Sequence, residues 1–182
     1  MDTPSQRRGL RYSDAGFTLI ELLIYISVLA IIVLSVSSFF TWAIKSNAKV
    51  KTMREVADNA RMATEIMTHE IREAASIYLP TFSASQLSLE TSHYLPLGEA
   101  STYIDFYLCG NASTTLCFKK ESQNPIALTS DNVEVDNLEF ILIATTTPSV
   151  QINLGIKYRN PNNRPEFISS INLISTVSLR SY

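Results

Sequence analysis

The distribution of apolar residues divides the chain into three segments. Residues 1–16 are polar and basic, whereas residues 17–44 are apolar and contain Glu21 as their only charged side chain. A helix needs about 20 such residues, at ~1.5 Å of rise each, to cross a bilayer. Residues 17–44 are therefore predicted to form a transmembrane helix.

The second segment, residues 45–79, has helical periodicity. Apolar residues recur at steps of three and four from Met53 to Ala74, with charged residues between them. This spacing predicts an amphipathic helix with one buried face. Because no proline interrupts either segment before Pro80, one continuous helix is expected from about Phe17 to about Ile77.

The third segment, residues 80–182, has the short alternating runs of a β-sheet. Residues 102–109 and 115–120 alternate apolar and polar side chains across a turn-rich stretch, which predicts a hairpin. Further strands are expected at residues 87–90, 138–144, 150–158 and 171–179. The predicted fold class is α+β, with one long N-terminal helix packed on an antiparallel sheet that forms the head.

The two cysteines, Cys109 and Cys117, lie in the predicted hairpin. Both lie beyond the predicted transmembrane helix, in a region that we expect outside the cytoplasm. A close pair in such a region predicts one disulfide, and two unlinked thiols are the alternative. A register that places the cysteines directly opposite each other also places Asp105 opposite Glu121. That pair of like charges counts against the register.

The charge of the chain argues against direct nucleic-acid binding. The formal net charge is −2, and residues 80–182 contain nine acidic and six basic side chains. Binding through counterion release requires a basic stripe, and none is present in the sequence of this region.

The sequence contains no convincing catalytic or metal-binding cluster. The helix segment around His69 resembles a zinc-peptidase motif, but Glu73 stands where the second histidine ligand must be. Asp131, Glu134 and Asp136 could supply oxygens to calcium, although a polar turn explains them more simply. We therefore expect no enzyme, no cofactor and no metal site.

The string Gly16-Phe17-Thr18-Leu19-Ile20-Glu21, preceded by a short basic leader and followed by an apolar run, resembles the processing motif of type IV prepilins and pseudopilins. The resemblance implies that a membrane-bound prepilin peptidase cleaves between Gly16 and Phe17, and that Phe17 is then N-methylated. Residues 1–16 would be the leader peptide that is removed.

Glu21 has a physical role in this scheme. A carboxylate within an apolar membrane segment costs ~2.5–3.5 kcal/mol and needs a partner, yet residues 17–44 contain no Lys, Arg or His. Cleavage creates an ammonium group at Phe17, and the resemblance implies that Glu21 pairs with this group on a neighbouring subunit during filament assembly. The alternative is a signal anchor whose Glu21 is protonated or reaches the membrane surface.

Two features favour a minor subunit. Ser38 occupies the position where major pilins usually carry a helix-softening proline. Segments 70–74, 132–140 and 176–180 also resemble, more weakly, the J-type pseudopilins and W-type minor pilins.

The resemblance also implies partners and a location. The expected partners are the prepilin peptidase, other pilins or pseudopilins, and an inner-membrane assembly platform. The chain would cross the inner membrane once, with a cytoplasmic N-terminus, and then enter an extracytoplasmic filament of a pilus, type II secretion or competence system. A single-pass, membrane-anchored adhesin or receptor that does not polymerise is the rival hypothesis.

Overall fold

The computed structural model describes residues 16–93, 95, 97–110, 112–121, 123–144 and 148–180. The predicted leader, apart from Gly16, lies outside the described residues. The chain divides into two compact units, Met1–Ile44 and Lys45–Tyr182, which are described separately below.

The helix α1 spans Leu19–Glu73 and contributes to both units. At its start, the Thr18 hydroxyl accepts a hydrogen bond from the backbone N–H of Glu21 at 3.4 Å, in the manner of an N-cap. Residues 19–44 are the described helical part of the first unit, and nearly all of their side chains are exposed in the isolated chain.

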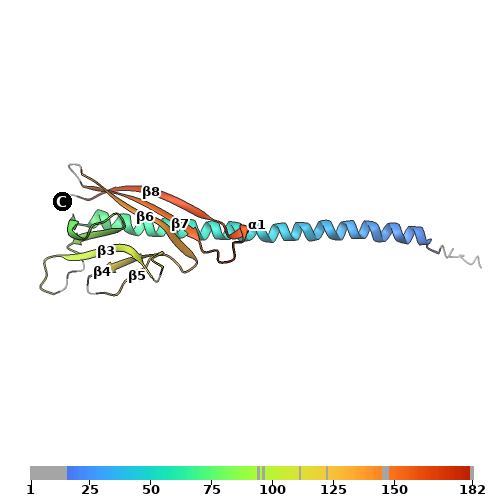
Figure 1. The fold of residues 1–182 in the computed structure, drawn as a ribbon, viewed down its shortest axis with the longest axis horizontal. Coiled ribbons are helices and arrows are strands. Elements are labelled where there is room, and N and C mark those ends of the chain that lie inside the picture. Colours follow the sequence, from blue (N-terminus) through green and yellow to red (C-terminus); the bar gives the residue numbers. More distant parts are fainter. Residues whose placement is uncertain are drawn as a thin grey trace, which may run out of the picture. The chain divides into compact units, whose positions relative to one another are not determined.

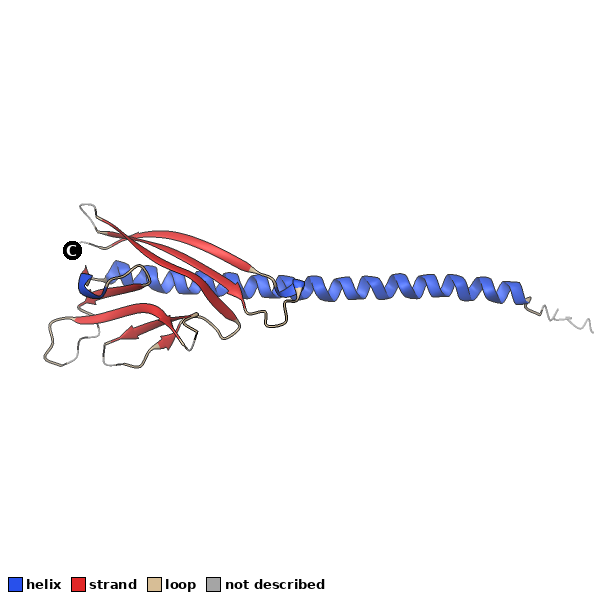
Figure 2. Ribbon diagram, viewed as in Figure 1, coloured by secondary structure: helices blue, strands red, loops and turns tan. Residues whose placement is uncertain are grey.

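The second unit contains two antiparallel sheets beside the C-terminal part of α1 (Figure 1), where the sequence predicted a single sheet. Figure 2 shows these strands in red. The five-stranded sheet has the order β1-β2-β3-β4-β5, with β1 Ser76–Ile77, β2 Gln86–Thr91, β3 Thr102–Cys109, β4 Thr115–Lys120 and β5 Ile126–Ala127. The three-stranded sheet has the order β6-β7-β8, with β6 Val133–Ile143, β7 Ser149–Tyr158 and β8 Ser170–Ser178. Two 3-10 helices complete the described elements, η1 Leu79–Thr81 and η2 Pro165–Phe167.

The helix ends earlier than the sequence predicted, at Glu73 rather than near Ile77. The backbone of the following residues pairs with β2 instead of continuing the helix. The N–H of Ala75 donates to the carbonyl of Glu90 at 2.8 Å, and the N–H of Tyr78 donates to Ser88 at 2.9 Å. Pairing with β2 therefore satisfies the backbone N–H groups of Ala75 and Tyr78, so the helix ends several residues before it reaches Pro80.

One hydrophobic core joins α1 to both sheets. The predicted apolar face of the helix is buried from Val56 to Ala74, whereas Met53 at its expected start is 54% exposed. Small side chains, Ala60 and Ala63, face the sheets and have no exposed surface. Fully buried residues from the two sheets complete this core, among them Leu87, Leu89, Ile104, Phe106, Ile152, Leu154 and Ile156.

The strand β6 begins five residues earlier than the predicted strand at 138–144. Its register with β7 shifts between Val135 and Asn137, which is a β-bulge at Asp136. The extra residue breaks the alternation of apolar and polar side chains, so the pattern reveals only the part of the strand after the bulge. Gly155 of β7 lies against the bulge, where a Cβ atom would meet the side-chain oxygens of Asp136 and Asn172.

The hairpin of β3 and β4 forms with a different register from the predicted one. Cys109 pairs with Thr115, and Cys117 pairs with Tyr107, so the cysteines lie diagonally rather than directly opposite. The shift places Asp105 opposite Lys119 instead of a second acidic residue. Opposite charges across a strand pair are favourable and like charges are not, so this register avoids the unfavourable pair of the predicted one.

The predicted disulfide between Cys109 and Cys117 is present, with their Cα atoms 5.8 Å apart. A shift of two residues keeps every side chain on its original face, so both cysteines still share one face of the hairpin. The rings of Phe106 and Phe118 share the opposite face, with their centroids 5.1 Å apart.

Replacing both cysteines by serine is expected to lower the free energy of unfolding by about 2–3 kcal/mol, because the open chain gains entropy in its unfolded state. Denaturant unfolding of the detergent-solubilised full chain, followed by circular dichroism, would measure the change. Wild-type protein treated with a reductant serves as the control and should match the double variant. Equal stability of the oxidised and reduced proteins would contradict the prediction.

Candidate processing and assembly site

The predicted cleavage site lies in a short non-helical segment before α1. Gly16 and Phe17 precede the helix. Apart from Gly16 and its two chain neighbours, no atom of the described residues lies within 4 Å of the position that a Cβ of Gly16 would occupy. Phe17 is 72% exposed, and its ring contacts that of Tyr25 at a centroid distance of 6.0 Å. An exposed, non-helical backbone of this kind is accessible to a protease.

The predicted assembly residue, Glu21, lies in the first turn of α1 and is half-buried. Its carboxylate accepts one long hydrogen bond, of 3.4 Å, from the hydroxyl of Tyr25. An acidic side chain is favourable at the positive end of a helix dipole. Because residues 17–44 contain no basic side chain, this segment offers the carboxylate no cation of its own.

The helix around Glu21 has the properties of a candidate membrane anchor. Among the described residues, α1 is the one helix that is long and apolar enough to cross a bilayer, judged by length and composition. The side chains of its apolar stretch are exposed in the isolated chain, for example Leu19 (79%) and Leu34 (71%). An apolar surface of this extent requires a lipid or protein environment to cover it.

Comparison with known protein families supports the resemblance of the N-terminal segment to a prepilin motif. Residues 11–37 match the model of the prokaryotic N-terminal methylation motif, and the matched segment includes Gly16, Phe17 and Glu21. No curated protein and no solved structure matches the chain.

The fold and the motif together define the class of protein. An α+β chain with a long, apolar N-terminal helix, antiparallel sheets and the methylation motif is a type IV pilin-like protein, as the sequence predicted. Proteins with this motif have structural rather than enzymatic roles. The motif implies processing by the prepilin peptidase and assembly with pilins in general.

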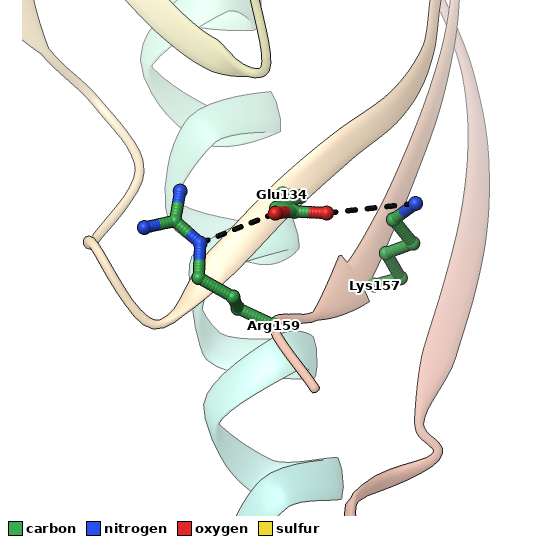
Figure 3. Close-up of polar contacts among 3 residues, drawn as sticks. All are labelled: Glu134, Lys157 and Arg159. Carbon is green, nitrogen blue, oxygen red and sulfur yellow. Dashed lines mark hydrogen bonds and ion pairs between the residues drawn. The ribbon is translucent and has the colours of Figure 1, made fainter. Parts of the chain in front are cut away.

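Of the acidic residues considered for calcium, Glu134 forms ion pairs with two basic side chains. The carboxylate of Glu134 binds Lys157 Nζ at 3.5 Å and Arg159 Nε at 3.2 Å (Figure 3). Within the described ranges, no group of three or more His, Cys, Asp and Glu side chains is arranged to hold a metal ion. These partly exposed ion pairs link β6 to the end of β7 and contribute only ~0–1 kcal/mol each.

The residues of the incomplete zinc motif lie on the surface of the helix. His69 is exposed on α1, and Glu73, which replaces the second histidine, has its carboxylate 3.6 Å from Nε2 of His93.

Sequence reasoning missed a polar contact between α1 and the loop before β6. The side-chain oxygen of Asn59 accepts the backbone N–H of Ser130 at 2.8 Å, and the carboxylate of Glu55 accepts the side-chain N–H of Asn132 at 2.7 Å. The sequence could have indicated this contact, because Glu55 and Asn59 lie one helical turn apart beside the buried face of the helix.

Proposed function

We propose that the chain is a structural subunit, a minor pilin or pseudopilin, of a type IV filament that serves a pilus, type II secretion or competence system. Cleavage between Gly16 and Phe17 removes residues 1–16, and Phe17 is then N-methylated. Residues 17–44 anchor the subunit in the membrane and later pack in the filament core. The helix continues from residue 45 to Glu73, and the residues after it form the extracytoplasmic head.

The observation that carries this proposal is the environment of Glu21. It is the only charged residue in the apolar segment, it lies in the first helical turn, and it has no basic residue nearby in sequence. The new ammonium group at Phe17 of an adjacent subunit supplies the opposite charge. In a filament core of low dielectric constant, this pairing selects one axial register between neighbouring helices.

The proposed location and partners follow from the same features. The N-terminus starts in the cytoplasm, the helix crosses the inner membrane, and an assembly platform passes the processed subunit into the filament with its sibling pilins. The disulfide between Cys109 and Cys117 supports an oxidising, extracytoplasmic position of the head. Ser38 in place of proline supports a minor rather than a major subunit.

The test is the mass of the mature N-terminus in a host that has the prepilin peptidase. We expect the chain from membranes and from sheared filaments to begin at N-methylated Phe17. The same host without its peptidase is the control, and its chain should begin at Met1. A chain that keeps residues 1–16 in the complete host would contradict the proposal and would favour an anchored adhesin or receptor.

A further inference from the structure

The outer edge of β8 is less protected than the other sheet edges of the head. In the five-stranded sheet, the edge strands β1 and β5 have only two residues each. The free side of β6 is partly covered, because the N–H groups of Val135 and Phe140 donate to the carbonyls of Thr114 and Ala84 at 2.8 Å. The edge strand β8, in contrast, has nine residues.

The sequence of β8 lacks the devices that usually protect an edge. Ser170–Ser178 contains no charged residue, no proline and no glycine, and it pairs with β7 through nine consecutive residues without a bulge. Long, flat and uncharged edges readily accept another strand, and soluble proteins normally avoid them. An open edge of this composition therefore indicates a binding surface for an extended segment.

The hydrogen bonds at the two ends of β8 show which backbone groups point outward. Tyr158 donates to Ser169 at 2.8 Å and Leu179 donates to Pro148 at 3.0 Å, so these are hydrogen-bonded pairs. Such pairs alternate along an antiparallel ladder. The N–H and C=O groups that face away from β7 therefore belong to Ser170, Asn172, Ile174, Thr176 and Ser178. Among the described residues, these outward groups make no backbone hydrogen bond.

The core beneath β8 is also incompletely covered. Ile171 and Leu173 point toward the core but are only partly buried, whereas Ile152 and Leu154 of the neighbouring strand are 1% exposed. On the outer face, Ile174 is 70% exposed. An additional strand beside β8 would satisfy the outward backbone groups and cover the open side of Ile171 and Leu173.

We propose that the β8 edge binds an extended, uncharged segment from the head of the adjacent filament subunit, which adds to the sheet as a strand. This inference rests on the proposed function, because filament assembly brings the heads together. The partner segment is not a second β8. Two β8 edges paired antiparallel are related by a two-fold axis, whereas filament helices all point the same way.

Substitutions at Thr176 test the backbone part of the proposal in the full chain, expressed in host cells. Thr176→Pro removes one outward N–H but no hydrogen bond to β7, and proline is tolerated at such edge positions. Its ratio of filament to membrane protein should fall about ten-fold, while Thr176→Val, which keeps the N–H, should match the wild type. Normal membrane levels and an intact Cys109–Cys117 disulfide would show that the variant still folds.

A second pair of variants distinguishes binding at the β8 edge from binding to the outer face of the same sheet. Ile174→Lys places a charge on the outer face of β8. Ile141→Lys places one on the same face of the sheet but on β6, on the far side of β7 from the β8 edge. We expect only Ile174→Lys to reduce incorporation. Equal effects of both lysines would show binding through the face and would overturn the edge model.

A photoreactive amino acid at position 176 identifies the occupant. The expected product links this position to an extended head segment of another pilin-like subunit, mapped by mass spectrometry. A link to β8 of a second copy, or to a protein outside the filament, would overturn the proposal. If Phe17 is processed and Glu21→Ala blocks assembly, but every β8 variant assembles normally, only the edge proposal fails.

Discussion

Glu21→Ala is expected to leave cleavage at Gly16/Phe17 intact but to reduce incorporation of the subunit into filaments at least about ten-fold. The cleavage site itself is unchanged, so the membrane fraction should contain mature protein that begins at Phe17. The loss arises in assembly, because the ammonium group of the neighbouring subunit would be left buried without a partner. Removing one member of a buried ion pair costs ~3–5 kcal/mol. Immunoblots of sheared filaments and membranes would give the ratio.

Two further variants separate charge from shape at this position. Glu21→Gln keeps the length of the side chain but removes its charge, and it should behave like Glu21→Ala if ion pairing is the cause. Ser35→Ala changes a polar residue of the same helix whose hydroxyl donates to the carbonyl of Ile31 at 2.8 Å, and it should assemble normally. Normal incorporation of Glu21→Gln would refute the charge-pairing mechanism.

Phe106→Ala is expected to have the largest effect on the stability of the head, a loss of about 3–5 kcal/mol in the free energy of unfolding. Phe106 has no exposed surface, and it lies opposite Leu87 on one side and Phe118 on the other. Truncation removes contacts to both neighbouring strands and leaves a cavity that the paired strands can only partly close. Denaturant unfolding of the detergent-solubilised full chain would measure the loss.

Two controls show whether the loss at Phe106 comes from a cavity. Phe106→Leu should cost less, because leucine leaves a smaller void. Leu97→Ala removes a side chain that is fully exposed in a loop, so its effect should stay within about 0.5 kcal/mol. A similar loss for Leu97→Ala and Phe106→Ala would contradict the assignment of Phe106 to the core.

The register of the β3–β4 hairpin shows where sequence reasoning reaches its limit. The alternation of side chains has a period of two, so a shift of two residues leaves every residue on its original face. The faces of Cys109, Cys117 and Phe106 were therefore predictable, while the partner of Asp105 was not. The one clue to the shift was the pair of like charges, Asp105 and Glu121, that the predicted register placed opposite each other.

The sequence by itself determined the N-terminal part of this protein, from the methylation motif around Gly16 and Phe17 to the apolar helix with its single acidic residue. These features are local, because they depend on residue type and spacing along one segment. The buried helix face and the disulfide partners were predictable for the same reason.

Only the tertiary structure decided where α1 ends, that the head has two sheets rather than one, and that β8 is left as an open edge. Each of these features depends on hydrogen bonds between distant backbone groups. The helix ends where the N–H of Ala75 donates to the carbonyl of Glu90, and the β6 edge is partly covered because it donates to the carbonyls of Ala84 and Thr114. Hydrogen bonds between residues far apart in the chain are a property of the packed elements, so no local pattern of side chains specifies them.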